Sequence, residues 1–208
     1  MPTGDEKIGD FLDRLAARVP APGGGAAAAL HVALGAALLG MAARYTDGGT
    51  DEESQVTIGH IIAEVDELRA LAVRLGEAEA HAIAAVAAAA RLPASTEAEQ
   101  AARAAAVTEA LVDAAWPSAK IISVAGMVVD IAGALAMISN RNVISEIAAA
   151  AVAAGAAAAT ARVNLEISLA DITDEQASLE MIGQIGKADD IVARADRVTA
   201  TVRERIRS

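Results

Sequence analysis

Hydrophobic residues recur at helical spacing along most of the chain. In residues 5–18 the apolar positions are three or four apart, which predicts a short amphipathic helix. These positions are Ile8, Phe11, Leu12 and Leu15. Residues 25–45 are apolar almost all round, and a helix of this kind belongs in the centre of a bundle.

A longer helix is predicted over residues 51–91, which at ~1.5 Å per residue would span ~60 Å. One apolar stripe can be followed along it. The stripe consists of Ile58, Ile62, Val65, Leu68, Ala72, Leu75, position 79, Ile83 and Val86. Position 79 is a glutamate, and burial of a carboxylate without a partner raises its pKa toward the range useful for proton transfer. Glu79 is therefore a candidate catalytic residue.

The remaining segments are also helical in pattern. A cap followed by acidic residues starts a helix at residues 95–99 that runs to Trp116, and Pro117 is expected to begin a new helix through Met137. Asn142 is a suitable N-cap for the next helix, and a charged amphipathic helix runs from about residue 174 to Arg207. No strand pattern appears in the sequence. We predict an all-α, single-domain bundle of about seven helices over residues 1–208, with a long central helix.

Composition narrows the function classes. The formal net charge of −11 and an aromatic content of 1% argue against a nucleic-acid surface, which needs basic groups and stacking platforms. The absence of cysteine excludes disulfides and thiolate chemistry. Residues 21–43 open with PGGG and carry His31, and residues 147–161 are too short to span a bilayer, so no membrane segment is expected. With no signal-peptide pattern at the N-terminus, a soluble cytoplasmic protein is expected.

The stretch VPAPGGGAAAA at residues 19–29 is the most distinctive in the chain. Three consecutive glycines leave no side chain between the first amides of the following helix and a ligand, and these amides favour a carboxylate or phosphate. No lysine and serine or threonine follow, and no strand precedes, so this is neither a Walker loop nor a dinucleotide fingerprint. From the residues alone, a plain helix connection is about as good an interpretation as a ligand site.

A second polar group lies near residue 140. Glu146 is the one charge before a fifteen-residue run of small apolar residues, and Arg162 lies at the far end of that run. Small residues permit close contact between helices, so this segment is expected in the core or at a subunit interface.

Several motifs together resemble the formiminotransferase-cyclodeaminase family, in its C-terminal cyclodeaminase branch, which includes stand-alone methenyltetrahydrofolate cyclohydrolases. The motifs are PAPGGG with its alanine helix, ARYT at 43–46, ELR at 67–69, EAHAIAAV, RLPxxTExExxAR, WP, NRNVISE and ARVNLEIS. They occur in order over nearly the whole chain. The resemblance implies an all-helical subunit, a homodimer with the folate site near the subunit interface, and one-carbon chemistry on tetrahydrofolate, with no metal.

The resemblance also implies site residues. The family's PxPGGGS turn maps onto Pro20, Pro22, Gly23, Gly24 and Gly25, with Ala26 in place of its serine. Its DAEAF segment maps onto Glu79-Ala80-His81-Ala82-Ile83, and its GNPNxISD turn maps onto Ser139, Asn140, Arg141, Asn142, Val143, Ile144, Ser145 and Glu146. At both Glu79 and Glu146 the family's aspartate is a glutamate. Its RINL segment maps onto Arg162, Val163, Asn164 and Leu165.

The implied chemistry needs a base for N10 of the folate and an acid for the departing nitrogen, and carboxylates with raised pKa can serve as both. We expect Glu79 and Glu146 to be these carboxylates. Asn140 and Asn142 are expected to orient the substrate, and Arg162 or the glycine turn to bind an anionic carboxylate. Two other interpretations remain: an enzyme of the same fold with a different one-carbon or amidine substrate, and a non-catalytic helical dimer.

Overall fold

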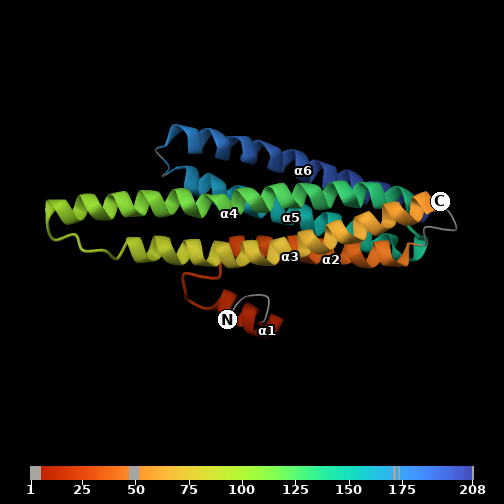
Figure 1. Cartoon of the computed structure of the whole chain (residues 1–208), viewed down its shortest axis with the longest axis horizontal. Helices are drawn as coiled ribbons and strands as arrows, with labels where there is room; N and C mark the ends of the chain where they lie inside the picture. Colours follow the sequence, from red (N-terminus) through yellow and green to blue (C-terminus); the bar gives the residue numbers. More distant parts are fainter. Residues whose placement is uncertain (1–5, 47–51, 171, 173, 208) are drawn as a thin grey trace.

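The computed structural model describes residues 6–46, 52–170, 172 and 174–207, and this part of the chain is all-α. The helices are α1 (Ile8–Ala16), α2 (Gly24–Tyr45), α3 (Glu52–Ala89), α4 (Glu97–Ile138), α5 (Ile144–Leu169) and α6 (Glu175–Arg207), with a short 3-10 turn, η2 (Arg141–Val143). Figure 1 shows the long helices lying side by side, with α1 beside the bundle and outside it. The predicted all-α fold is confirmed.

The bundle has one helix fewer than predicted because Pro117 does not end a helix. It lies inside the continuous 42-residue α4. A proline within a helix removes one hydrogen bond, to the carbonyl four residues earlier. That residue is Asp113, which is exposed, so water can satisfy its carbonyl in place of the lost N–H.

Helix α5 occupies the middle of the bundle and packs against α2, α4 and α6, while α3 packs against α2 and α4. Alanine dominates the contacts, which lets these helices approach closely, and a few larger side chains fill the remaining space. The fully buried large side chains include Leu39, Ile122, Ile147 and Leu165. The predicted core position of the small-residue segment is confirmed.

The stripe predicted along α3 is partly buried as expected. Ile58, Val65, Leu68 and Ala72 are buried, and Glu79 is buried with them. The other predicted stripe positions, Ile62, Leu75, Ile83 and Val86, are half-buried. The predicted first residue of this helix, Asp51, lies outside the described residues.

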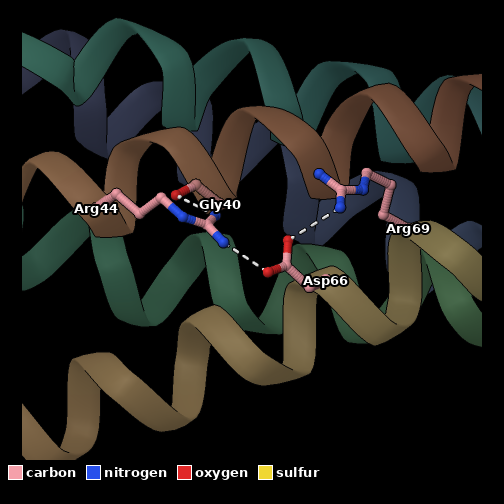
Figure 2. Close-up of polar contacts among 4 residues, drawn as sticks. All are labelled: Gly40, Arg44, Asp66 and Arg69. Atoms are coloured by element: carbon pink, nitrogen blue, oxygen red, sulfur yellow. Dashed lines mark hydrogen bonds and ion pairs between the residues drawn. The ribbon is translucent and has the colours of Figure 1, made fainter.

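Helix α2 is joined to α3 by a polar clamp (Figure 2). Arg44 donates to the Gly40 carbonyl at 3.1 Å and to the Asp66 carboxylate at 2.5 Å. Arg69 pairs with the other Asp66 oxygen at 3.3 Å. Arg44 and Arg69 belong to the ARYT and ELR motifs, so these two motifs have a structural role in holding α2 against α3.

The turn before α5 differs from the prediction. Asn142 is not the N-cap of the long helix, since it lies inside η2, and its backbone N–H donates to the Asn140 side-chain oxygen at 2.9 Å. The cap position of α5 is Val143, which offers no side-chain hydrogen bond. The 3-10 turn moves the capping function two residues upstream, to Asn140.

Three helical segments are long and apolar enough to cross a membrane by length and composition, namely residues 24–45, 97–138 and 141–169. The expectation that residues 147–161 are too short to span a bilayer does not hold, because the helix that contains them, α5, runs from Ile144 to Leu169. In the bundle, between 50% and 61% of each apolar window is buried against the rest of the chain. The apolar character of these helices thus serves internal packing to a large extent.

Candidate active site

A cavity of about 250 Å³ opens where α2 begins. Helices α2, α3 and α5 contribute most of its walls, with the glycine turn at the start of α2. Helix α4 closes one side. The lining residues are Pro20, Gly23, Gly24, Gly25, Glu79, Ala80, Ile83, Ala114, Ser118, Asn164, Ile167 and Ser168.

Glu79 is the only charged side chain among these lining residues, and it is 4% exposed. Its hydrogen-bond partner is the Ser118 hydroxyl, at 3.4 and 3.5 Å from the two carboxylate oxygens. Burial disfavours the charged form and raises the Glu79 pKa from 4.5 to about 7, while the bond from Ser118 lowers it. A carboxyl group with this pKa can both accept and donate a proton near neutral pH.

The third glycine of the turn makes room for that carboxyl group. A Cβ added to Gly25 would lie 2.0 Å from one Glu79 carboxylate oxygen and 2.2 Å from the carboxyl carbon. No side chain could occupy this position without moving Glu79. The run of three glycines is therefore not a plain connection between helices, since at least Gly25 is required by the packing of the glutamate.

The other two glycines lie at the cavity mouth. Gly23 is the N-cap residue of α2, and no side chain accepts a hydrogen bond from the backbone amides of the first turn of this helix. A Cβ on Gly24 would lie 3.6 Å from the Asn164 side-chain oxygen. The structure thus brings together Glu79, the glycine turn and Asn164, which were predicted from three separate motifs.

Two other predicted residues are close in sequence to the cavity but do not line it. Pro22 is buried behind the turn, and Pro20 lines the cavity in its place. Arg162 pairs with Glu166 at 3.3 Å and with Asp189 on α6. Its charge is already balanced by two carboxylates, so it is a poor candidate for binding an anionic ligand within this subunit.

The second predicted cluster lies at the opposite end of α5. Asn164 and Glu146 are on this same helix, eighteen residues apart, which corresponds to ~27 Å along the axis. Asn140, Asn142 and Ser145 lie further still from the cavity. Glu146 is half-buried and accepts a hydrogen bond from the Ser145 hydroxyl at 3.4 Å. Within one subunit, therefore, the two predicted carboxylates are not a pair.

Ser118 is the residue that sequence reasoning missed. It is 2% exposed and lies on the buried side of α4, directly after Pro117. A lone hydroxyl among alanines and isoleucines was the available signal, because a buried polar side chain requires a partner. Only the packing of α4 on α3 identifies that partner as Glu79.

Among the residues that the structure describes, no three histidine, aspartate or glutamate side chains come together as a metal site. The cavity is lined by a single carboxyl group, the hydroxyl groups of Ser118 and Ser168, an amide and a helix start. This arrangement suits proton transfer on a small polar ligand with an anionic or hydrogen-bond-accepting part.

Comparison with known proteins agrees with this geometry. The sequence model of formiminotransferase-cyclodeaminase matches residues 7–187, which includes every cavity residue. The chain belongs to the formiminotransferase-cyclodeaminase family. The predicted resemblance is confirmed.

Two relatives match this chain over different shares of their own length. A methenyltetrahydrofolate cyclohydrolase from Methylorubrum extorquens is 32% identical over 205 residues, covering 98% of this chain and 99% of that protein. The formimidoyltransferase-cyclodeaminase of Mus musculus is 32% identical over 172 residues, covering 82% of this chain and 32% of the mouse protein. This chain thus corresponds to about a third of the mouse enzyme.

A solved structure of this family has the same fold. The crystal structure of formiminotetrahydrofolate cyclodeaminase from Thermotoga maritima matches with a TM-score of 0.84 and 25% identity, covering 98% of each chain. The helical arrangement described above therefore matches that of the solved cyclodeaminase chain over nearly its whole extent.

Proposed function

We propose that this chain is a folate-dependent one-carbon enzyme that acts at the carbon bridging N5 and N10 of tetrahydrofolate, either as a formimidoyltetrahydrofolate cyclodeaminase or as a methenyltetrahydrofolate cyclohydrolase. The observation that carries the proposal is Glu79, a buried carboxyl group with a pKa of about 7 in a cavity beside an uncapped helix start. The names of the family members support the substrate class.

In cyclodeamination, N10 attacks the formimidoyl carbon on N5, an N10–C bond forms, and the bond from that carbon to the terminal nitrogen breaks. The proton on N10 must be removed, and the terminal nitrogen, which carries one hydrogen as =NH, must gain two protons to leave as ammonia. One of these is the proton taken from N10, and the other comes from solvent and balances the positive charge of the methenyl product. A single carboxyl group with a pKa of about 7 can take the proton from N10 and pass it to the departing nitrogen. Glu79 is proposed as this acid–base residue.

In the cyclohydrolase reaction, water adds to the bridging carbon and one carbon–nitrogen bond then breaks. Glu79 would accept one proton of the attacking water and return it to the nitrogen that departs, while the second proton of the water is released to solvent as the formyl carbonyl forms. The same group and the same cavity therefore serve both reactions. Relatives bearing each name match nearly the full chain, so activity measurements must decide between them.

The remaining cavity groups are proposed to hold the substrate. The first amides of α2, reached past Gly23 and Gly24, suit a carboxylate or the pterin carbonyl. The Asn164 amide can both donate and accept hydrogen bonds. Apolar walls from Ile83 and Ile167 suit the flat ring in a chain that has few aromatic residues.

The setting is proposed to be a cytoplasmic homodimer that needs no metal for the reaction. Exposed apolar side chains on α2 and α5, among them Met41 and Val152, support the dimer. The non-catalytic alternative requires both glutamates to be exposed or locked in ion pairs, and a Glu79 bonded to a hydroxyl in a cavity disfavours it.

The test is a spectroscopic turnover assay with 5-formimidoyl-tetrahydrofolate and with 5,10-methenyl-tetrahydrofolate, offered separately. Wild type is expected to convert one of them, and Glu79→Gln is expected to lose at least ~100-fold in rate, since acid–base groups contribute about that much or more. Glu67→Gln is the matched control, because Glu67 is exposed on the same helix. Failure of wild type to convert either folate would contradict the proposed substrate class.

A further inference from the structure

The cavity at the start of α2 has one charged side chain among its lining residues, and that charge is negative. No lysine, arginine or histidine stands beside Glu79 in the described part of the lining. Arg162, which was predicted to bind an anion, lies outside this set and pairs with Glu166 and Asp189. When Glu79 ionises, no side chain that lines the cavity in this subunit balances its charge.

The side chains that face Glu79 from the neighbouring helices are neutral. Helix α2 presents Gly25 to it, and α4 presents the Ser118 hydroxyl, 3.4 Å from one carboxylate oxygen. Helix α5 contributes Asn164 and Ser168 to the same cavity, and neither of them ionises. The charged form of Glu79 is therefore stabilised by dipoles alone.

The titratable groups nearest to Glu79 in the chain do not change this balance. Glu77 and His81 are two residues away on α3, and neither lines the cavity. A buried carboxylate without a cation costs free energy, and burial is the largest cause of the raised Glu79 pKa, about 7. A ligand that brings a positive charge would remove much of that cost.

The substrates of the proposed function carry such a charge on the one-carbon unit. A formimidoyl group on N5 is an amidine, a strong base that holds an extra proton in water at neutral pH. A methenyl bridge is also an amidinium ion, with its positive charge spread over N5, the bridging carbon and N10. A formyl group on the same nitrogen is neutral, although its size and shape are nearly the same.

We propose that the cavity is an amidinium site, in which the Glu79 carboxylate pairs with the delocalised cation of the one-carbon unit and thereby selects cationic over neutral one-carbon folates. The inference rests on the proposed function and adds the property by which the substrate is recognised. It also covers ligands other than folates, because a small amidinium ion such as acetamidinium should bind to Glu79 where its neutral isostere acetamide does not.

The start of α2 is compatible with this orientation of the substrate. In a tetrahydrofolate the pterin carbonyl lies next to N5, so the ring oxygen and the one-carbon unit are neighbours. The glycine turn and Glu79 are neighbours too, since the carboxyl group occupies the space of a side chain at Gly25. The amides of the turn can therefore meet the carbonyl oxygen while the carboxylate meets the cation.

Selection by charge predicts different responses to pH. An opposite charge within ~4–6 Å lowers a carboxyl pKa by about 1–3 units, so the cation should bind ionised Glu79 about 10 to 1,000 times more tightly than protonated Glu79. Since the free carboxyl group has a pKa of about 7, affinity for the cation should fall about five- to tenfold from pH 8 to pH 6. A formyl folate should not weaken, because protonated Glu79 can donate to its oxygen.

A binding experiment compares the two kinds of folate. Trp116, the only tryptophan of the chain, lies two residues before Ser118, and quenching of its fluorescence after rapid mixing reports binding before turnover. At pH 8 wild type is expected to bind 5-formimidoyl-tetrahydrofolate at least ~10-fold more tightly than 5-formyl-tetrahydrofolate, with a smaller preference at pH 6. Glu79→Gln should bind both about equally. Glu67→Gln, at an exposed position of the same helix, should keep the wild-type preference.

A second experiment uses no folate. Wild type is labelled with ¹³C at its glutamate carboxyl groups, and the Glu79 resonance is identified by its absence from Glu79→Gln. Acetamidinium chloride should lower the titration midpoint of this resonance by about one unit or more, because the cation favours the charged form. Acetamide and sodium chloride at the same concentration should leave the midpoint unchanged.

The outcomes separate charge selection from the proposed function. If wild type converts a folate but binds the formimidoyl and formyl compounds equally at pH 8, charge selection is refuted and the proposed function stands. A preference that survives in Glu79→Gln also refutes it, as does a Glu79 midpoint that moves with neither or with both of the small ligands. If the cationic folate is preferred but neither substrate is converted, the proposed function fails and charge selection stands.

Discussion

The two glutamates at opposite ends of the bundle differ in almost every physical respect. Glu79 lies among helices α2, α3 and α4, where burial raises its pKa to about 7. Glu146 begins α5, is half-buried, and bonds to the neighbouring Ser145 hydroxyl. The sequence does not make this difference plain, since each is a glutamate on a helix rich in alanine. The contrast teaches that the chemistry of a carboxyl group is set by what packs around it. At Glu79 the missing side chain of Gly25 leaves the space in which the carboxyl group is buried.

The largest effect is expected from Gly25→Ala, which would push the Glu79 carboxyl group out of its buried position and so reduce its difference from Glu146. The added Cβ would overlap the Glu79 carboxyl group, and the side chain would have to turn out of its place. A displacement of about 1 Å can cost ~100-fold in rate, so we expect a loss of that order in kcat/KM for the active folate. Gly59→Ala is the control, as that helical glycine is exposed with open space around it. Equal activity of the two variants would show that Glu79 need not be held where the structure has it.

The second effect is on stability and its dependence on pH. The folded pKa of Glu79 is about 7 and the ordinary value is 4.5, so between these values the folded state keeps a proton that the unfolded state has lost. The free energy of unfolding should therefore fall as pH rises through this window, by at most about 3 kcal/mol. Glu79→Gln should be more stable than wild type at pH 8 and lose that advantage near pH 4. Urea unfolding of wild type and Glu79→Gln at several pH values measures this difference.

A smaller effect is expected from Ser118→Ala. The hydroxyl favours the charged form of Glu79, so its removal should raise the pKa of that carboxyl group further. The limb of the kcat/KM profile that reports Glu79 should move to higher pH by less than about one unit, given that a hydrogen bond of this kind contributes ~1 kcal/mol. A pH–rate profile of both proteins measures the shift. A limb that stays in place would mean that the Ser118 hydroxyl does not tune Glu79.

The smallest effect is expected from Asp66→Asn, which breaks the clamp of Figure 2. The Arg44 and Asp66 side chains are 47% and 33% exposed, and ion pairs at such sites contribute about 0.2 to 1 kcal/mol. Thermal unfolding should register this loss, while kcat and KM for the folate should not change. A large loss of turnover would mean that the clamp, and the motifs that supply it, act on the site after all.

Much of the fold could be predicted from periodicity. Apolar positions three and four apart indicated α1 and α3, while all-round apolar runs, capping signals and a charged amphipathic pattern indicated the other helices. The alanine-rich segments were expected in the core, where α2 and α5 indeed lie. Local signals failed where tertiary context outweighed them. Pro117 stays within α4 because the carbonyl that loses its hydrogen-bond donor belongs to Asp113, which is exposed. Asn140 provides the capping hydrogen bond that was predicted for Asn142.

By itself the sequence determined the all-helical fold and the family, and it singled out Glu79, the glycine turn and Asn164 as candidate site residues, because each of these depends on residue type and spacing. Tertiary structure alone decided which of the polar groups meet. Side chains far apart in the chain come together only through the packing of helices, which is why Ser118 was missed as the partner of Glu79. In the sequence Gly25 is one of three consecutive glycines, and only the fold shows that the Glu79 carboxyl group occupies the space that a side chain at position 25 would need.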